Sequence, residues 1–526
     1  MTTNRFYILC TALAITLGTQ AQQQPVSGEQ YRYADETQLW RLTGNAAGLS
    51  LDVNGPDTAA VNRGVAYFQM NHRGGDLHRV QEGGQQNTLE FFTERYQKIG
   101  KYLYGYGSFH FNMGRTKQRA WSDVLRTYNS NPYISGSSVF GSYDQQNITL
   151  DASLSTIRLG HFTYGANLFY QVGDLSRLRD PRSRINLAEY RLTPSVTYTF
   201  GDANTTAGRH TAGLSLHYDR RKEKLPSLST VQTDPTLMYY VMTGLENADG
   251  AIGYYNGYMR EYVNHEFGGE LSYQYRDACV QSLTTLSLAH GTEYVYGTNK
   301  YEPGRYYTYS YGLSSRNRLH SGRLLHTADL SLNYEEGYAD EYRQERTQTT
   351  DATTGITSVR WNTTMRYNKR YQLKKFDLDV HYRLSFTNEQ KTTGYVGAEY
   401  VLQNVRNRRL LRTSQLHYAS SEATAEGGWL IGRHLWAEAR AGYHFATKAD
   451  LQLANVETTY AQAVLLPDMT ILDADYFRGR LQLTYQTPLT IKGYTSNWFA
   501  SAYADHLKAS HGLHRTTLGV SIGLYY

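Results

Sequence analysis

Long runs in which apolar and polar residues alternate one for one dominate this chain. From Phe376 to Phe386, six apolar side chains alternate with five polar ones. A period of two is typical of β-strands whose two faces meet different environments. Residues 374–387 make 14 residues, or about 46 Å of strand at ~3.3 Å per residue. A tilted membrane strand needs only ~9 to 11 residues, so this run could cross a bilayer and project beyond it.

The same alternation recurs along the chain, for example over residues 162–172 and 328–334. The 48 Tyr and 46 Gly, against 10 Pro, favour strands over helices. We therefore predict an all-β protein, a transmembrane antiparallel β-barrel of about 16 strands (14–18), with long extracellular or lumenal loops. The alternative is a secreted β-sandwich or solenoid, whose strands usually run only about 5 or 6 residues.

The N-terminus is predicted to be an export signal, with Arg5 followed by an apolar stretch from Phe6 to Leu17 and a small residue at Ala21. The expected organisation is a signal peptide (1–21), a short N-terminal segment (22–40) and an outer-membrane barrel (41–526). A segment of 22–40 is too short for the folded plug of a TonB-dependent carrier, so that class is disfavoured. After cleavage only Cys279 would remain, which excludes an intramolecular disulfide.

The end of the chain resembles the terminal strand signal of bacterial outer-membrane barrels, because apolar residues alternate up to a final aromatic. This resemblance implies recognition by the barrel-assembly machinery and a location in the cell outer membrane. The residues of the predicted targeting signal are Leu518, Val520, Ile522, Leu524 and Tyr526.

Five stretches are predicted to be long loops: 113–145, 173–188, 220–266, 335–356 and 446–475. Two basic clusters fall in them and could bind lipopolysaccharide head groups or acidic substrates, since Arg pairs bidentately with phosphate and carboxylate. An equally open alternative is a charge network that pins a loop inside the lumen. Nucleic acid is not expected for an exported protein with a net charge of +6. The clusters are Arg177, Arg179, Arg182 and Arg184, and Arg220, Arg221, Lys222 and Lys224.

Several sequence blocks resemble an uncharacterised outer-membrane barrel family of the Bacteroidota. They include Thr43 to Leu49, Arg79 to Gly83, Thr93 to Lys98, Trp121 to Val124 and Val263 to Gly269. The resemblance implies a barrel in the outer membrane and transfers no catalytic residue. Members tend to be encoded beside TonB-dependent receptors and surface lipoproteins, which implies a companion role in surface uptake or assembly.

Two patterns could indicate a hydrolase. The G-x-S-x-G pattern at residues 519–523 lies within the predicted last strand, whereas the motif works on a sharp strand-to-helix turn. Ser215, His217 and Asp219 share one strand face, but neighbours on one strand stand about 6 to 7 Å apart and supply convergent geometry poorly. An ordinary polar lumen face explains these three residues equally well.

A third cluster could hold a divalent metal near the last hairpin, although hairpin loops are also polar by default. No metal or cofactor is predicted, because neither Cys pairs nor a fixed His spacing strengthens the pattern. Its residues are Asp505, His506, His511 and His514.

Taken together, these patterns predict a non-enzymatic outer-membrane β-barrel. It would act as the membrane subunit of a surface uptake or assembly complex, with a TonB-dependent receptor or surface lipoprotein as a possible partner, or as a passive pore. The alternative is an outer-membrane hydrolase with a lumen-facing Ser/His/Asp site. A secreted adhesin-like β protein would dispense with the membrane.

Overall fold

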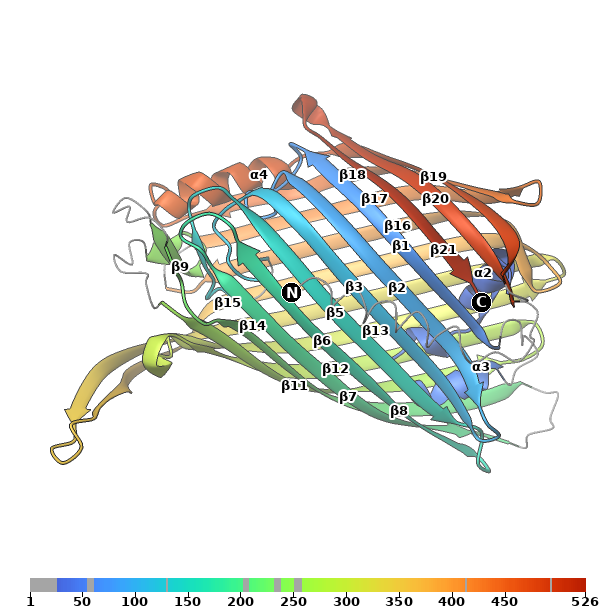
Figure 1. Ribbon diagram of the computed structural model, residues 1–526, viewed down its shortest axis with the longest axis horizontal. Coiled ribbons are helices and arrows are strands. Elements are labelled where there is room, and N and C mark those ends of the chain that lie inside the picture. The colour runs from blue at the N-terminus through green and yellow to red at the C-terminus, as the bar shows by residue number, and fades with distance from the viewer. Residues whose placement is uncertain are drawn as a thin grey trace.

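A computed structural model shows a closed antiparallel barrel of 18 strands (Figure 1). The structure describes residues 26–53, 61–128, 131–201, 208–230, 238–249, 258–411, 414–491 and 494–526, so the predicted signal peptide lies outside the described residues. The barrel strands are β1 Arg63–Gly75, β2 Gln85–Ile99, β3 Leu103–Arg119, β5 Gly141–Thr156, β6 Phe162–Arg177, β7 Arg184–Thr199, β8 Arg209–Leu225, β11 Arg260–Arg276, β12 Val280–Tyr296, β13 Gly304–Ser321, β14 Leu324–Thr350, β15 Thr357–Asn388, β16 Lys391–Arg409, β17 Ser414–Ile431, β18 Leu435–Gln452, β19 Tyr476–Ile491, β20 Tyr494–Ala509 and β21 His514–Tyr525.

The last strand closes the barrel on the first. β21 pairs with β1 in a continuous register from Val65 opposite Tyr525 to Gly75 opposite Arg515. Closure leaves no unpaired sheet edge, which is the condition for strands to span a hydrocarbon layer.

The alternation places apolar side chains outside and polar ones inside, as predicted. On β15, Val380 and Tyr382 point outward and are 42% and 44% exposed. Arg383 lies between two residues that point outward, but its own side chain points into the lumen. There it forms ion pairs with Glu426 and Glu36. An apolar exterior around a closed ladder is stable only in lipid, so the protein is an outer-membrane barrel. Among the described residues, no helix is long and apolar enough to cross a membrane.

The two ends of the barrel differ in the length of their connections. Tight turns join β11 to β12 through residues 277–279, β13 to β14 through 322–323 and β15 to β16 through 389–390. Longer connections lie at the other end, which also carries the β1–β2 connection, residues 76–84. By the usual arrangement of such barrels the short turns are periplasmic and the long loops extracellular, and we name the two ends accordingly.

Several predicted loops are wrong. Residues 335–350 belong to β14, and its hairpin with β15 projects far beyond the barrel (Figure 1). Likewise 220–225 belong to β8 and 260–266 to β11, while only residues 178–183 separate β6 from β7. The outer face of these strand ends carries polar residues such as Lys222 and Lys224, because it meets water beyond the bilayer, so the contrast between the two faces disappears. The 18 strands lie at the upper bound of the predicted range of 14–18 and exceed the central value of about 16.

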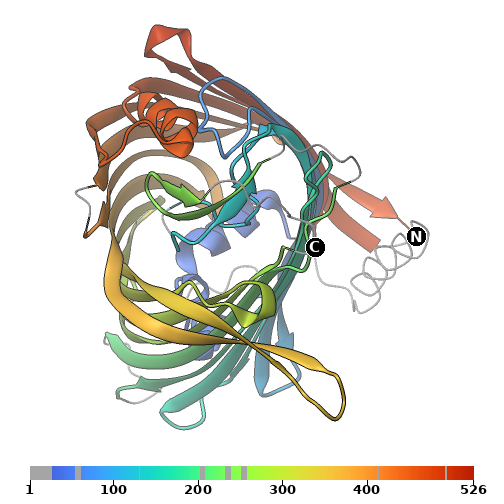
Figure 2. The same ribbon diagram turned by 90° about the vertical axis from the view of Figure 1, so that its left-hand side faces the viewer.

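The first barrel strand begins at Arg63 and not near residue 41, so the segment before the barrel is longer than expected. Residues 26–53 form four short helices: α2 Gly28–Thr37, η1 Trp40–Leu42, η2 Ala46–Gly48 and α3 Leu49–Val53. A capping box starts α2: the Gln30 backbone N–H donates to Ser27 Oγ at 3.2 Å, and the Ser27 N–H donates to Gln30 Oε1 at 2.9 Å. Figure 2 shows these helices inside the ring of strands. We call residues 26–53 the lumenal segment.

Further elements gather at the extracellular end. A small sheet of β4 (Ser135–Ser137), β9 (Tyr239–Gly244) and β10 (Asn247–Asp249) lies within the ring in Figure 2. The helices η4 (Ala461–Leu465) and α4 (Leu466–Leu472) lie at the rim. Together with residues 120–128 and 131–134, we call these elements the extracellular cap. Short 3-10 turns also occur at η3 (Thr298–Lys300) and η5 (Ser510–Gly512).

Candidate functional site in the barrel lumen

The lumenal segment is bound to the inner wall by hydrogen bonds on several sides. On one side the Glu36 carboxylate accepts hydrogen bonds from Ser385 Oγ on β15 and Thr392 Oγ1 on β16, both at 3.0 Å. Arg383 lies 3.5 Å from the same carboxylate, and Arg318 of β13 donates to the Glu36 carbonyl at 2.5 Å. Burial raises the pKa of Glu36 despite these partners. A buried carboxylate with this many donors fixes α2 firmly in place.

On the opposite side of the barrel, three side chains of the wall form hydrogen bonds with the backbone of Ala47. Ser155 Oγ of β5 and Thr163 Oγ1 of β6 donate to its carbonyl at 2.8 and 2.9 Å. Its N–H donates to Ser195 Oγ of β7 at 3.0 Å. A Cβ added at Gly165 would come 2.3 Å from the Ala47 nitrogen, so the segment touches the wall backbone there. The strand has a glycine where the segment approaches most closely.

The buried carboxylate of Asp52 joins the middle of the lumenal segment to its C-terminal end. Trp40 is fully buried; its backbone N–H donates to Asp52 Oδ2 at 2.8 Å and its indole N–H to Gln274 Oε1 of β11 at 2.9 Å. Burial raises the pKa of Asp52 to about 7, although Arg276 and Arg41 act in the opposite direction. The segment thus has a small core of its own against the wall, made of Leu39, Trp40, Leu51 and Leu283.

Apolar contacts hold the extracellular cap. Trp121, Tyr133 and Met242 of the cap are almost completely buried and form one cluster with inward residues of the wall. Tyr460 and Val464 of the rim helices complete it. The wall contributes Tyr262, Val295, Tyr306, Ala339, Tyr371, Leu373, Val405 and Tyr418. The lumen is therefore apolar near the extracellular end, and burial of the cluster stabilises the cap by about 1.5–3 kcal/mol per large side chain.

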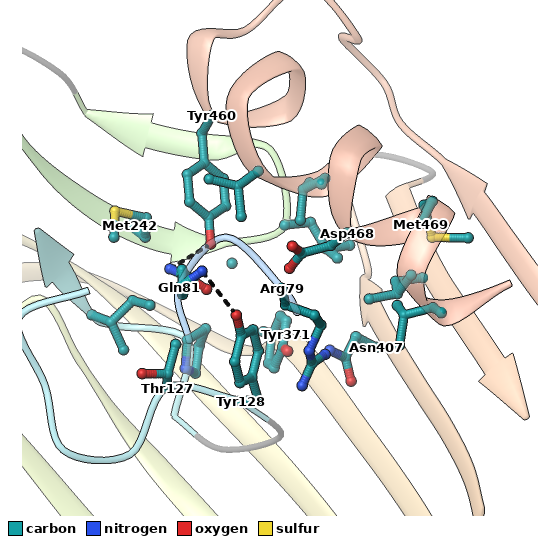
Figure 3. Close-up of a pocket in the computed structure, with 18 of the residues that line it drawn as sticks. Arg79, Gln81, Thr127, Tyr128, Met242, Tyr371, Asn407, Tyr460, Asp468 and Met469 are labelled. Carbon is teal, nitrogen blue, oxygen red and sulfur yellow. Dashed lines mark hydrogen bonds between the residues drawn. The ribbon is translucent and has the colours of Figure 1, made fainter. Parts of the chain in front are cut away.

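Polar contacts connect the cap to the β1–β2 connection (Figure 3). Gln81 donates from its backbone N–H to Tyr128 Oη at 3.1 Å and from its amide to Tyr460 Oη at 3.3 Å. Asp468 of α4 accepts from the Val80 N–H at 2.9 Å, and burial raises its pKa to about 6. The cavity enclosed here has a volume of about 90 Å³. That is well below the ~300–1,000 Å³ of typical ligand sites, so the contacts join the cap to the β1–β2 connection without enclosing a ligand-sized space.

A larger cavity, of about 580 Å³, lies along the inner wall of the barrel. Residues of β1, β2, β3, β5, β6, β19, β20 and β21 line it, and most of them are polar. It falls within the ordinary size range of ligand sites.

The Ser/His/Asp constellation faces the lumen but is not assembled. His217 Nε2 lies 3.5 Å from Glu266 Oε1, and Asp219 accepts from Arg191 Nε at 3.1 Å. Ser215 is buried near Gly44 of the lumenal segment. Each of the three residues therefore contacts a different neighbour, as expected of an ordinary polar lumen face. Ser521 of the G-x-S-x-G pattern lies in the middle of β21, without the turn that the motif needs.

The residues of the predicted metal cluster point to opposite faces of the wall. Asp505 faces the lumen and accepts from Arg478 at 3.0 Å, whereas His506 Nδ1 lies 2.9 Å from Thr516 Oγ1 outside. His514 is near His506, with ring centroids 6.3 Å apart. Among the residues whose side chains are described, which omit His511, no three metal-binding groups meet.

The basic clusters lie at strand ends and make contacts within the protein. Arg177 is buried and donates to Tyr143 Oη at 2.8 Å. The other ion pairs are Arg182–Asp180 and Arg184–Asp174 at 3.0 Å, Arg221–Glu293 at 3.1 Å, and Lys222–Glu261 and Lys224–Glu261 at 3.3 and 3.9 Å. Binding of lipopolysaccharide or acidic substrates by these clusters stays a prediction.

Sequence reasoning did not find the lumenal segment or the cavity. The partners of Ala47 lie more than a hundred residues away along the chain, so no local pattern reveals them. The small polar residues Ser155, Thr163 and Ser195 in otherwise alternating strands were the only available signal.

The model of one protein family, described as "Family of unknown function (DUF6850)", matches residues 56–526. No curated protein matches the sequence. Among solved structures, the chain is similar to the ferric citrate transporter FecA (8% identity, TM-score 0.41, 88% of this chain and 78% of that chain). It is also similar to the outer-membrane transporter YddB from Escherichia coli (8%, 0.39, 88% and 80%) and to the copper transporter OprC (8%, 0.35, 88% and 82%). Likeness at this level transfers neither substrate nor mechanism.

Proposed function

We propose that this chain, which belongs to that family of unknown function, is a non-enzymatic outer-membrane barrel that passes a hydrophilic solute under the control of its own lumenal segment. One observation carries the proposal: residues 26–53 lie inside the barrel and contact strands around it, from β5 through β15 to β20. A permanently open, passive pore would have no use for such a segment.

The extracellular cap and the lumenal segment both lie across the lumen, and the different contacts that hold them support a gated lumen. The extracellular cap buries one large aromatic cluster, whereas the lumenal segment is held by several small apolar clusters and by hydrogen bonds to polar groups of the wall. Polar contacts can be exchanged for water at modest net cost, about 0.5–1.5 kcal/mol each. Apolar burial cannot be replaced in this way, so we expect the lumenal segment to be the more readily displaced of the two.

Planar-bilayer recording of four purified proteins tests the proposal. They are the full chain, a variant without residues 26–53, a variant in which 461–472 are replaced by a short Gly/Ser linker, and the combination of both changes. We expect few steady steps from the full chain and regular steps from the combination. Steady large steps from the full chain would indicate a passive pore, and silence of a folded combination variant would refute passage.

A control variant removes a comparable length of chain outside the lumen. Residues 345–362 form the tip of the β14–β15 hairpin, and Gln344 and Thr363 are cross-strand partners that a two-residue turn can join. This variant should conduct as the full chain does. All variants must keep the heat-dependent gel migration of a closed barrel.

The projecting hairpin favours a second candidate function, as the membrane subunit of a surface complex. The hairpin exposes Ile356 (67%) at its tip and Met365 (46%) nearer the barrel on β15, and exposed apolar side chains on a projecting element suit a protein contact. The proposed partners are a TonB-dependent receptor or a surface lipoprotein. Crosslinking in native membranes should capture such a partner with the full chain and not with the variant lacking 345–362; equal capture would refute this role of the hairpin.

A further inference from the structure

The 580 Å³ cavity in the lumen is rich in hydrogen-bond donors and carries excess positive charge. Four arginines line it, Arg73 on β1, Arg478 and Arg480 on β19, and Arg515 on β21, and its only carboxylates are Glu90 and Asp505. The formal charge of this lining is therefore 4 − 2 = +2 with His110 neutral. Six side-chain amides complete the polar part of the lining: Asn71, Gln86, Asn112, Gln145, Asn147 and Gln171.

Both carboxylates are already occupied by neighbours in the wall. Asp505 accepts from Arg478 at 3.0 Å, and that arginine also lies 3.6 Å from Glu422. Glu90 accepts from Asn112 at 3.1 Å. Arg480 has no acidic partner within the described chain; it donates to Gln482 at 2.9 Å and stacks over the Tyr503 ring at 4.4 Å.

Arg73 and Arg515 are the uncompensated pair. In the part of the chain that the structure describes, neither side chain forms an ion pair or a hydrogen bond. Their like charges repel each other across the β1–β21 seam, and Glu82 attracts Arg73 without pairing to it. Both are only half-exposed and point inward from adjacent strands. Two neighbouring guanidinium groups without an anion are costly in a partly desolvated cavity, so the arrangement is favourable when an anion bridges them.

We propose that this cavity binds a hydrophilic solute through an oxyanion group, a carboxylate or a phosphate, held by Arg73 and Arg515. Guanidinium groups match such anions bidentately, and the surrounding amides donate to the remaining polar groups of the solute. This inference deepens the proposed function by naming the solute class. The passage of the solute rests on the proposed function, whereas the binding of the solute does not depend on it.

Binding is measured directly on the purified full chain in detergent at low ionic strength. Inorganic phosphate and succinate serve as probes of the two anion types, and glucose serves as a neutral probe. The test variant is Arg73→Gln/Arg515→Gln. Its matched control is Arg115→Gln/Arg346→Gln, which removes two exposed arginines outside the cavity, one paired with Asp144 and the other donating to Gln348 Oε1.

Titration calorimetry should show binding of phosphate, succinate or both by the full chain, with no heat from glucose. The cavity variant should lose at least tenfold in affinity, and the control should stay within twofold. If the cavity variant does not migrate as a folded barrel, Arg515→Gln alone takes its place. No binding of either anion by the full chain, or equal affinity in the cavity variant and the control, overturns the site.

The same proteins separate this inference from the proposed function. Anion binding without conductance in the variant lacking both closures would refute passage and leave the site standing. Conductance through that variant, with anion affinity unchanged by loss of Arg73 and Arg515, would refute the site and leave passage standing.

Discussion

The hydroxyl oxygens of Ser50 and Ser155 lie 3.0 Å apart, one in the lumenal segment and the other on β5 of the wall. Both residues are buried, so the pair joins the segment to the barrel at a place shielded from solvent. Side chains in such close contact are near the geometry of a disulfide. The position of the segment can therefore be fixed covalently.

The first prediction uses this pair. In a Cys279→Ser background that also lacks residues 461–472, Ser50→Cys/Ser155→Cys should show no current steps when oxidised, because the segment cannot leave the lumen. Reductant should restore intermittent steps in bilayer recordings. The single variant Ser50→Cys should not respond to oxidant. Equal conductance of the oxidised and reduced double variant would contradict a role of the segment in closure.

A second prediction concerns Glu36, which has more wall partners than any other side chain described above. Glu36→Ala leaves Ser385 and Thr392 without their acceptor and removes one of the two carboxylates beside Arg383, at about 1–3 kcal/mol. Hydrogen exchange of residues 28–37 should accelerate about tenfold or more. Glu345→Ala, on the exposed hairpin, should leave this exchange unchanged. Unaltered exchange in the Glu36 variant would mean that packing alone holds α2.

A third prediction is the pH dependence of docking through Asp52. Its pKa is raised by burial to about 7 from an ordinary 3.8, so the docked state favours the protonated form. Docking is then strongest at low pH and weakens as pH rises from about 4 to 7, by at most tenfold per pH unit. Exchange of residues 40–53, corrected for intrinsic rates, should show this slope.

Asp52→Asn serves as the control for the pH effect. Its amide oxygen can still accept from the Trp40 N–H, but it does not titrate. The slope between pH 4 and 7 should therefore flatten in this variant. A slope that persists would assign the effect to other groups, of which Glu36 is the first to examine.

The sequence predicts the membrane face of the wall far better than it predicts the lumen. Val380 and Tyr382 alternate with polar residues because lipid lies on one side and polar contacts on the other. Beyond the bilayer that contrast disappears: Arg221 points inward to Glu293 while Lys222 pairs with Glu261, so the sequence predicts a loop where the strand continues. The lumenal site depends on pairs such as Glu36 with Thr392, more than 350 residues apart. Contacts between residues so far apart along the chain leave no periodic pattern in a single sequence.

A fourth prediction tests the faces of the wall with one substitution at two sites. Val380→Arg places a charge in lipid and should destabilise the barrel by about 2–4 kcal/mol. Ser331→Arg places the same side chain in the lumen opposite Asp379, its partner in register on β15, and should cost little. Urea unfolding of both variants in the same detergent measures the difference. Equal destabilisation, or a greater cost at 331, would invert the faces.

The last prediction separates two roles of the terminal aromatic residue. Tyr526 Oη lies 3.1 Å from Thr93 Oγ1 and donates to the Glu94 carbonyl at 3.3 Å, so the chain end is bound to β2 across the β1–β21 seam. Tyr526→Phe keeps the aromatic ring and removes these hydrogen bonds, whereas Tyr526→Ala removes both. If the ring is an assembly signal, the Phe variant should accumulate in outer membranes as the native chain does, and the Ala variant should accumulate several-fold less. Equal loss in both variants would assign the effect to seam closure, and normal accumulation of the Ala variant would remove Tyr526 from the targeting signal.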